Sequence, residues 1–434
     1  MDNKYFEPEI ETISRPDLEK LQLERLKSTI AQAVKSPFYS KLYAEKGIDV
    51  NTIESIDDIR KLPFTTKQDM RDNYPFGFLA CDQKDVTRLH SSSGTTGNPT
   101  VICHTKNDLD TWANRVARSF YMVGLRNTDV IQNSSGYGMF TGGLGMQAGI
   151  ERLGAMSIPA AAGNSLRQIK FIMDFGTTAI HAIPSYALRL ADVFEEVGID
   201  PKTQTHLTTF LIGAEPHTEE TRRKIEERFG VKAYNSFGMT EMSGPGVAFE
   251  CQEQNGMHIW EDSYLVEIVD PDTLEPVPDG EIGELVLTTL DREAMPLIRY
   301  RTRDLTRFLI DECPCGRTHR RLDRIKGRSD DMFIVKGVNI FPMQIEKILM
   351  QFPELGTNYL ITIDTIDNND IIFVDVELNS LTTDDFSVLQ NLGKEITRRI
   401  KDEILVTPKV RLVSRGSLPQ SEGKAVRVKD LRKQ

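Results

Sequence analysis

The sequence predicts an α/β protein with a large N-terminal part and a small C-terminal α+β part. From about residue 126, short runs of β-forming residues alternate with helical stretches, which is typical of parallel strands joined by crossover helices. After Tyr264, the runs 265–269 and 284–288 flank a Pro-Asp turn, which favours an antiparallel β portion. We therefore expect parallel or mixed sheets flanked by helices, followed by a β portion.

The first expected element is a helix that begins after Ser14, with Pro16 in the first turn, where proline is favoured. An apolar stripe then runs along it, formed by Leu18, Leu21, Leu26, Ile30 and Val34. The alternating region places strands at residues 130–131, 178–180 and 207–212, and helices at residues 166–173, 185–197 and 218–229.

A polar break with one glycine, KGRSDD, occupies residues 326–331. Composition alone leaves two interpretations open, an ordinary surface turn or a hinge between domains. The residues beyond it contain expected strands at 371–378 and 410–413 and an expected helix around 385–400. They predict a small α+β domain.

Composition excludes several classes of protein. The chain has 434 residues, with 53 Lys and Arg against 64 Asp and Glu, and this net charge of −11 argues against a nucleic-acid partner. No apolar run approaches the ~20 residues of a membrane helix. Five cysteines are too few for a disulfide scaffold, and residues 1–7 lack a secretion signal, so we expect a cytoplasmic protein without a membrane partner.

The decapeptide SSSGTTGNPT at residues 91–100 carries the clearest chemical signal. Its glycines allow consecutive backbone N–H groups to face one anion, and its hydroxyls add donors, as a polyphosphate requires. A flexible Ser/Gly linker is the alternative. The β-prone runs 86–89 and 100–103 on either side argue against that alternative. No Gly-Lys-Ser/Thr follows, so this is not a Walker A loop.

The decapeptide resembles the phosphate loop of the adenylate-forming superfamily of acyl-CoA synthetases, adenylation domains and luciferases. Further blocks resemble those of the superfamily and occur in the same order: GAEP at 213–216, YNSFGMTE at 234–241, YRTRD at 300–304, GRSDD at 327–331 and GK at 423–424. Within it, the chain is most similar to the phenylacetate–CoA ligase family, through FTTKQDMRDNYPFG at 64–77, YGMFTGGLG at 137–145 and VNIFP at 338–342.

The resemblance implies a two-step, AMP-forming acid–CoA ligation. A carboxylate attacks the α-phosphate of ATP to give an acyl-adenylate and pyrophosphate, and the CoA thiol then takes the acyl group and releases AMP. It also implies a nucleotide site made of Ser92, Ser93, Gly94, Thr95, Thr96, Gly97, Gly213, Ala214, Glu215, Pro216, Asn235, Ser236, Phe237, Gly238, Met239, Thr240, Asp304 and Arg328.

Individual roles follow from the same resemblance. Glu241 would hold Mg²⁺, the alternative being a solvated helix-cap acid after Thr240. Asp304 would bind the ribose hydroxyls, the alternative being an ion pair with Arg301 or Arg303. Arg328 would contact ribose or phosphate.

Two lysines are the further catalytic candidates. Lys424 would bridge the carboxylate and the α-phosphate, although by sequence alone it is one more exposed lysine in a basic tail. Lys67 is a weaker candidate for contact with the carboxylate or phosphate. Asp330 would be the hinge, which divides the chain into an N-terminal domain of residues 1–329 and a mobile C-terminal domain of residues 330–434.

An acyl pocket is expected from glycines and aromatic residues, which give backbone approach and flat apolar walls for a ring. The candidates are Tyr137, Phe140, Gly142, Gly143 and Phe237, and ordinary core packing is the alternative for some of them.

Cys251, His258, Cys313 and Cys315 form two pairs of soft or borderline ligands, which fit a tetrahedral structural zinc site. Free thiols with a surface histidine are the alternative, and His319 is a rival fourth ligand. Phenylacetate–CoA ligases commonly lack the second cysteine pair, so the resemblance does not explain this cluster.

The sequence thus predicts an ATP- and Mg²⁺-dependent aryl-acetate:CoA ligase with a structural zinc ion. Two alternatives remain: an enzyme that adenylates another aryl or cyclic acid, or passes the acid to a carrier protein instead of free CoA, and a nucleotide-binding protein without turnover. The retained Glu241, Asp304 and Lys424 argue against the second alternative. The resemblance also favours a homodimer.

Overall fold

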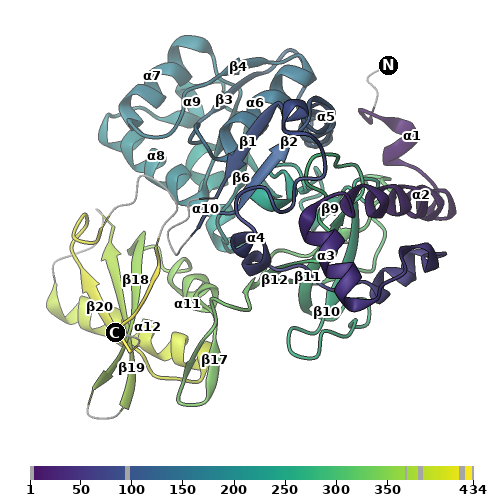
Figure 1. Ribbon diagram of the computed structural model, residues 1–434. Coiled ribbons are helices and arrows are strands. Elements are labelled where there is room, and N and C mark those ends of the chain that lie inside the picture. Colours follow the sequence, from purple (N-terminus) through teal and green to yellow (C-terminus); the bar gives the residue numbers. More distant parts are fainter. Residues whose placement is uncertain (1–3, 93–97, 367–368, 380–384, 420–425, 433–434) are drawn as a thin grey trace.

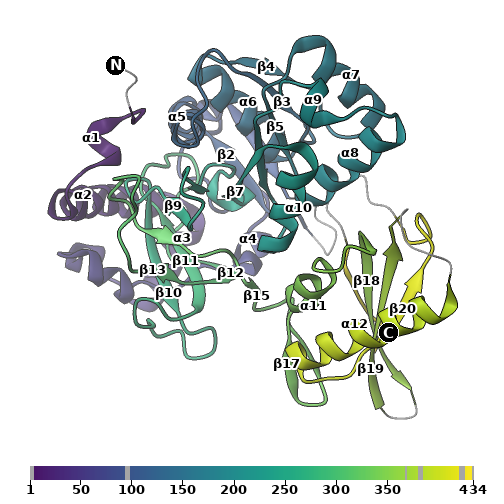
Figure 2. The ribbon, with the colours of Figure 1, turned by 180° about the vertical axis from the view of Figure 1, so that it is seen from behind.

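The computed structural model describes residues 4–92, 98–366, 369–379, 385–419 and 426–432. It confirms the predicted α/β class, with helices on both faces of a mixed sheet, a β portion, and a smaller C-terminal body (Figures 1 and 2). No helix within these residues combines the length and the apolar character needed to cross a bilayer.

The N-terminal region is helical. Its helices are α1 (Pro8–Glu11), α2 (Arg15–Ala33), α3 (Pro37–Lys46) and α4 (Lys67–Asp72). The Ser14 hydroxyl caps α2 by accepting a hydrogen bond from the Asp17 N–H, and Pro16 lies in the first turn, as the sequence predicts. The Thr66 side chain caps α4 in the same way, so Lys67 is the first residue of that helix.

A nine-stranded mixed sheet forms the centre of the described N-terminal part. In spatial order its strands are β13 (Phe308–Leu309), β14 (Arg321–Leu322), β9 (Met257–Ile259), β8 (Ala248–Glu250), β7 (Lys232–Phe237), β6 (Thr209–Gly213), β5 (Ala179–Ala182), β3 (Val130–Asn133) and β4 (Met156–Ile158). The run from β4 to β7 is parallel, and the strands beyond β7 are antiparallel.

Helices cover both faces of this sheet. Successive residues of a strand point to opposite faces, and apolar residues on both faces need a covering layer. The helices are α5 (Lys106–Met122), α6 (Thr141–Leu153), α7 (Ser165–Phe175), α8 (Pro184–Glu196), α9 (Pro201–Gln204) and α10 (Glu219–Phe229). Ala179 and Leu211 pack into the core that contains α5 and α6. Their neighbours Ile180 and Phe210 face the opposite core, which contains α7, α8 and α10.

Two smaller sheets complete this part. β1 (Arg88–Ser91) and β2 (Val101–His104) form an antiparallel hairpin around the segment 92–100. The predicted β portion is a sheet in the order β10 (Tyr264–Val269), β11 (Gly283–Thr289), β12 (Tyr300–Thr306) and β15 (Gly327–Arg328). Part of the polar break at residues 326–331 therefore forms the edge strand β15.

The C-terminal body has its own sheet in the order β20 (Lys409–Val413), β19 (Asn369–Leu378), β18 (Leu355–Ile366) and β21 (Val428–Asp430). The helices α11 (Pro342–Leu349) and α12 (Phe386–Ile404) and the hairpin β16 (Phe333–Val335) and β17 (Val338–Ile340) accompany it. Its buried apolar residues, from Phe333 to Val406, form a cluster separate from the N-terminal cores. In both ribbon views α11 faces α10 across the gap between the two bodies (Figures 1 and 2).

Candidate active site and metal centre

The β1–β2 hairpin holds the stem of the phosphate-loop segment. The Ser92 N–H donates to the Thr100 carbonyl oxygen at 3.0 Å, and the Thr100 N–H donates to the Ser92 hydroxyl oxygen at 3.0 Å. These bonds bring Ser92 and Thr100 together at the end of the hairpin. The candidates Ser93, Gly94, Thr95, Thr96 and Gly97 lie outside the described residues.

Glu241 lies at the foot of this stem, in a short 3-10 helix (Thr240–Met242), and is only 3% exposed. Its carboxylate accepts a hydrogen bond from the Thr100 hydroxyl at 3.0 Å and lies 3.6 Å from the Lys67 ammonium. The interpretation of Glu241 as a solvated cap is therefore wrong. Three side chains from distant segments converge here, and Lys67 remains half-exposed at the opening.

Two residues that the sequence analysis gave no role support this acid. The buried Arg292 guanidinium donates to the Glu241 carbonyl oxygen at 2.7 Å and fixes the backbone of the turn. Burial, and then the charge of Glu241, raise the pKa of Tyr300 well above its ordinary value, so the phenol stays protonated. The sequence could have indicated Tyr300, because it begins the YRTRD block that resembles the superfamily. Nothing in the sequence distinguishes Arg292 from other arginines.

A cavity of about 130 Å³ lies between the ends of β6 and β7 and the β portion. Apart from Gly213 and Thr240, all the described candidates for the nucleotide site beyond the loop line it, namely Ala214, Glu215, Pro216, Asn235, Ser236, Phe237, Gly238, Met239, Asp304 and Arg328. Arg324, which the sequence analysis did not select, lines it as well.

The backbone around this cavity is closely packed. A Cβ at Gly213 would lie 2.4 Å from the Ser236 carbonyl oxygen, so only glycine allows β6 and β7 to approach this closely. Ala214 adopts a left-handed conformation with φ of +66°. A non-glycine residue keeps this conformation only where the surrounding structure enforces it, and Ala214 lines the cavity.

Asp304 lies 3.7 Å from the Arg328 guanidinium, on neighbouring strands β12 and β15. The alternative ion pairs with Arg301 or Arg303 do not form, because both of those arginines pair with the buried Glu284. Asp304 and Arg328 thus share one side of the cavity.

The candidate hinge residue Asp330 pairs with Arg328 through two hydrogen bonds, of 2.8 and 2.9 Å. Hydrogen bonding to Asp330 and the charge of Asp304 raise the pKa of Arg328, against the effect of burial, so this side chain keeps its charge. Arg328 therefore lines the nucleotide cavity and also contacts Asp330, in the segment that leads into the C-terminal body.

Of the candidate acyl-pocket residues, Tyr137 and Phe140 lie just before α6, Gly142 and Gly143 lie in its first turn, and Phe237 ends β7. Tyr137 accepts a hydrogen bond from the Asn133 side chain at 3.1 Å, and Phe140 is 47% exposed. Gly143 packs against Gly136, where a Cβ would lie 2.6 Å from the carbonyl oxygen, whereas Gly142 has more room. Phe237 is buried and, of these candidates, lines the nucleotide cavity.

The four predicted zinc ligands come together. One potential ligand atom from each of Cys251, His258, Cys313 and Cys315 lies within 4.8 Å of the others, and all four residues are buried. Paired strands β8 and β9 position His258, and its Nδ1–H donates to the His319 carbonyl oxygen at 2.8 Å. That bond leaves Nε2 facing Cys315, at 3.2 Å from its sulfur.

His319 is not the fourth ligand. Its Nδ1 accepts a hydrogen bond from the Glu261 N–H at 3.0 Å, and its Nε2 donates to the Ile10 carbonyl oxygen at 2.9 Å. Both ring nitrogens are therefore used, and His319 is outside the group of four.

The loop that carries Cys313 and Cys315 holds the N-terminal segment. Tyr5 donates a hydrogen bond to the Cys315 carbonyl oxygen at 3.1 Å, and Arg317 forms a buried ion pair with Glu11 at 2.7 Å. The Thr318 N–H also donates to the Glu11 carbonyl oxygen at 3.1 Å. Residues 5–11 therefore pack against the loop that carries two of the four cluster residues.

Comparisons with known proteins agree with this geometry. Residues 24–289 match the AMP-binding enzyme family, and residues 337–432 match the AMP-binding enzyme C-terminal domain. The chain is 44% identical to the phenylacetate-coenzyme A ligase of Thermus thermophilus, over 99% of this chain and 100% of that protein. It is 46% identical to the Pseudomonas putida phenylacetate-coenzyme A ligase, over 98% and 96% of the two chains.

Among solved structures, the chain resembles a complex of 2-hydroxyisobutyryl-CoA ligase in its postadenylation state, with a TM-score of 0.93, 30% identity, and coverage of 100% and 93% of the two chains. The thioesterification complex of that enzyme, with an acyl-AMP and CoA, gives a TM-score of 0.74 at 32% identity, over 99% and 93% of the two chains.

Fold and cavity thus define an AMP-forming acid–thiol ligase of the adenylate-forming superfamily. Within that superfamily, the chain belongs to the phenylacetate–coenzyme A ligase family.

Proposed function

We propose that this protein couples phenylacetate, or a similar arylacetic acid, to CoA through an acyl-adenylate and releases AMP and pyrophosphate. One observation carries the proposal: Glu241, in the short helix that follows Met239, meets Thr100 and Lys67, and Met239 lines the same cavity as Asp304 and Arg328. The identity with curated phenylacetate–CoA ligases, 44–46% over nearly the whole chain, supports the choice of acid.

In the first step, a carboxylate oxygen attacks the α-phosphorus of ATP, and the bond to the β-phosphate oxygen breaks to release pyrophosphate. The difficulty is that an anion must approach a polyanion, so catalysis depends on alignment and charge neutralisation. We assign alignment of the nucleotide to Asp304, which would accept hydrogen bonds from both ribose hydroxyls, and to Arg328 beside it. Lys424, outside the described residues, would bridge the carboxylate and the α-phosphate.

The buried Glu241 offers a carboxylate to Mg²⁺, a hard cation that prefers carboxylate and phosphate oxygens. Such an ion neutralises phosphate charge. The Thr100 hydroxyl orients the carboxylate, and Lys67 supplies a nearby positive charge at the opening of the site. Because Thr100 closes the phosphate-loop stem, its hydrogen bond to Glu241 supports this assignment.

In the second step, the CoA thiol attacks the acyl carbonyl carbon, the thioester bond forms, and AMP leaves with the oxygen that joined it to the acyl group. We propose that residues 330–434 move as a body about Asp330 between the two steps. The separate apolar core of this body supports the boundary, and the exposed Arg328–Asp330 pair lies where the backbone would turn.

The acid would lie beside Tyr137, Phe140, Gly142, Gly143 and Phe237, and this assignment is supported by Phe237, which also lines the nucleotide cavity. Aromatic and glycine positions suit a planar ring. The homodimer and the cytoplasmic location expected from the sequence remain predictions.

We also propose that Cys251, His258, Cys313 and Cys315 bind a structural zinc ion. Three thiols and one imidazole suit tetrahedral zinc, and four protein ligands leave no position for substrate. The hydrogen bond from His258 to the His319 carbonyl supplies the outer-shell orientation that zinc-bound histidines require. Metal analysis of the purified protein tests this, and less than a tenth of an equivalent of zinc contradicts it.

A panel of carboxylic acids, assayed for pyrophosphate release with and without CoA, tests the proposed activity. We expect phenylacetate to support release of pyrophosphate and formation of its CoA thioester. Pyrophosphate without thioester would instead indicate transfer to a carrier protein, and a preference for another aryl or cyclic acid would reassign the substrate. ATP binding without turnover of any acid would indicate a nucleotide-binding protein that is not an enzyme.

A further inference from the structure

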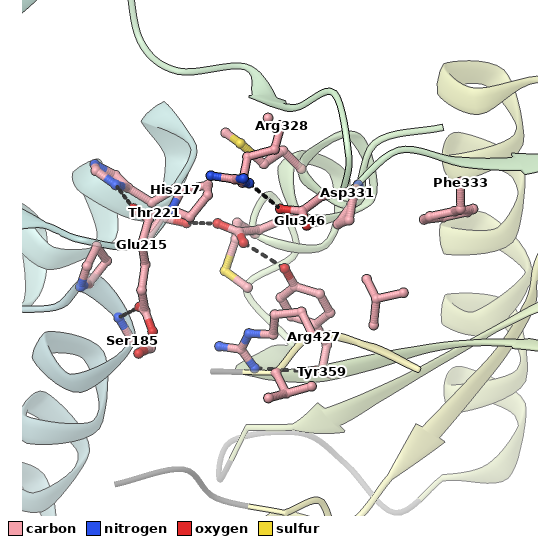
Figure 3. A pocket seen from close by; sticks show the side chains of 18 of the residues that line it. Ser185, Glu215, His217, Thr221, Arg328, Asp331, Phe333, Glu346, Tyr359 and Arg427 are labelled. Atoms are coloured by element: carbon pink, nitrogen blue, oxygen red, sulfur yellow. Dashed lines mark hydrogen bonds and ion pairs between the residues drawn. The ribbon is translucent and has the colours of Figure 1, made fainter. Parts of the chain in front are cut away.

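A buried glutamate of the C-terminal body contacts the N-terminal part. Glu346 lies on α11, is 8% exposed, and accepts a hydrogen bond from the Thr221 hydroxyl of α10 at 2.7 Å. The same carboxylate oxygen accepts a longer bond, of 3.4 Å, from the N–H of Thr218, the residue that caps α10. Figure 3 shows Glu346 between Thr221 on one side and Tyr359 on the other.

The carboxylate is held in place from its own side as well. The buried Tyr359 hydroxyl donates to the second oxygen of Glu346 at 2.6 Å. Burial, and then the charge of Glu346, raise the pKa of Tyr359 well above its ordinary value, so the phenol remains a donor. Both carboxylate oxygens are thus hydrogen-bonded, one across the interface and one within the C-terminal body.

Other polar contacts between the two bodies, within the described residues, lie at the exposed rim. Gln351 donates to Glu220 at 3.4 Å, and Arg415 pairs with Glu196 at 3.1 Å, with both partners exposed to solvent. Exposed pairs contribute little, whereas a buried hydrogen bond to a charged group is strong. Glu346 is therefore the polar contact best suited to fix the orientation of the C-terminal body.

The contact also connects to the segment that follows the undescribed residues 420–425. The Arg427 guanidinium donates to the Tyr359 carbonyl oxygen at 3.2 Å (Figure 3). It also donates to the Asn358 side chain at 2.8 Å. Asn358 donates in turn to the Pro419 carbonyl oxygen at 3.5 Å. Pro419 and Arg427, which lie on either side of residues 420–425, are thus hydrogen-bonded to β18. The same strand carries Tyr359, which donates to Glu346.

The orientation of the two bodies is the one that matches the postadenylation complex of 2-hydroxyisobutyryl-CoA ligase, with a TM-score of 0.93. The thioesterification complex of the same enzyme differs more from this chain, with a TM-score of 0.74. A rotation of the C-terminal body would carry Glu346 away from Thr221, because the two residues lie on different bodies.

We propose that Glu346 is a positioning residue that holds the C-terminal body in the orientation for acyl-adenylate formation. The inference rests on the proposed function. Breaking the contact with Thr221 shifts the enzyme away from that orientation, so the first half-reaction weakens and the second does not. A purely structural glutamate would affect both half-reactions alike.

Thr221→Val and Glu346→Gln, made singly and together, test this. Thr221→Val removes the hydroxyl donor, together with its 3.1 Å contact with the Thr218 hydroxyl, and keeps the size of the side chain. We expect each variant to lower acid-dependent exchange of pyrophosphate into ATP about tenfold, while thioester formation from supplied acyl-adenylate and CoA stays within about twofold of wild type. The double variant should lose little more than either single variant, since both act on the same hydrogen bond: Thr221→Val removes its donor, and Glu346→Gln removes the charge of its acceptor.

Gln351→Ala is the matched control, because it removes an exposed contact across the same interface; we expect it to leave both half-reactions unchanged. Equal losses in the two half-reactions, or unchanged exchange in Thr221→Val, would overturn the assignment of Glu346. Wild-type protein without acid-dependent exchange would overturn the proposed function itself, and this inference with it.

Discussion

The Thr100 hydroxyl donates a hydrogen bond to the Glu241 carboxylate at 3.0 Å, across 141 residues of sequence. This bond ties the stem of the phosphate-loop segment to the acid that we propose for Mg²⁺. It also explains why a carboxylate that is nearly inaccessible to solvent stays in one orientation, with Lys67 3.6 Å away.

Lys424→Ala should suppress adenylate formation at least a hundredfold, because the charge that bridges the carboxylate and the α-phosphate is lost. Thioester formation from supplied acyl-adenylate should fall much less. Pyrophosphate exchange and single-turnover thioester assays measure the two steps separately. Lys429→Ala, an exposed lysine on β21, is the control, and equal losses in both steps of Lys424→Ala would argue against the assigned role.

Asp330→Pro should impair thioester formation about tenfold or more and leave adenylate formation nearly intact, because proline fixes φ where the backbone would have to turn. Asp330→Ala removes the ion pair with Arg328 without fixing the backbone, and it should retain both half-reactions. If Asp330→Pro made the thioester at the wild-type rate, residue 330 would not be the hinge.

Asp304→Asn should raise the KM for ATP about tenfold, since an amide offers one acceptor oxygen where a carboxylate offers two charged ones. Steady-state kinetics at saturating acid and CoA measure this. Arg303→Ala on the same strand is the control, because Arg303 pairs with Glu284 and does not line the cavity. An unchanged KM would remove Asp304 from the nucleotide site.

Removal of zinc by a strong chelator should lower the melting temperature by about 5 to 10 °C and expose residues 5–11 to proteolysis, because the cysteine loop holds that segment. Cys315→Ser should reproduce the effect without chelator. Cys81→Ser, which changes a thiol outside the cluster, is the control. An unchanged cleavage pattern after complete metal loss would contradict the structural role.

Stability should fall as the pH falls from about 6.5 to about 4, partly through His181. Burial lowers the pKa of His181 to about 4, so in this window the unfolded chain binds a proton that the folded chain does not. The contribution of neutral His181 is complete above pH 6.5 and is lost with falling pH, by up to about 1.4 kcal/mol per pH unit.

Melting temperatures of His181→Asn at pH 7 and pH 5 measure this contribution. The variant should show a smaller decrease than the wild type, and His206→Asn, at an exposed position, should behave as the wild type does. Identical decreases in all three proteins would show that His181 does not carry the effect.

Local signals were sufficient for most of the fold. The Ser14 cap, the proline that follows it and the β-rich runs predicted α2, β3, β5 and β6 at their observed places, because caps and apolar periodicity act within a few residues. The cysteine and histidine cluster was also predictable, since few other roles explain four such residues in two pairs.

The partner of Asp304 could have been predicted better. On β12 the buried residues alternate with the half-buried Arg301 and Arg303, so both arginines lie on the opposite face from Asp304. Period-two alternation therefore excludes these ion pairs, although it does not reveal Arg328, which comes from another strand.

Contacts between distant segments were not predictable. Arg292 supports Glu241, and Glu346 meets Thr221, only after the chain has folded, and neither pair shares a local pattern. For the same reason, the exposed position of Phe140 in the candidate acyl pocket could not be read from its sequence neighbours.

The origin of one oxygen atom in AMP tests the central chemical claim most directly. Phenylacetate labelled with ¹⁸O in both carboxylate oxygens is converted with ATP, Mg²⁺ and CoA, and the products are analysed by mass spectrometry. Attack on the α-phosphate predicts one ¹⁸O atom in AMP and none in pyrophosphate. AMP without the label, or label in inorganic phosphate, would contradict an acyl-adenylate.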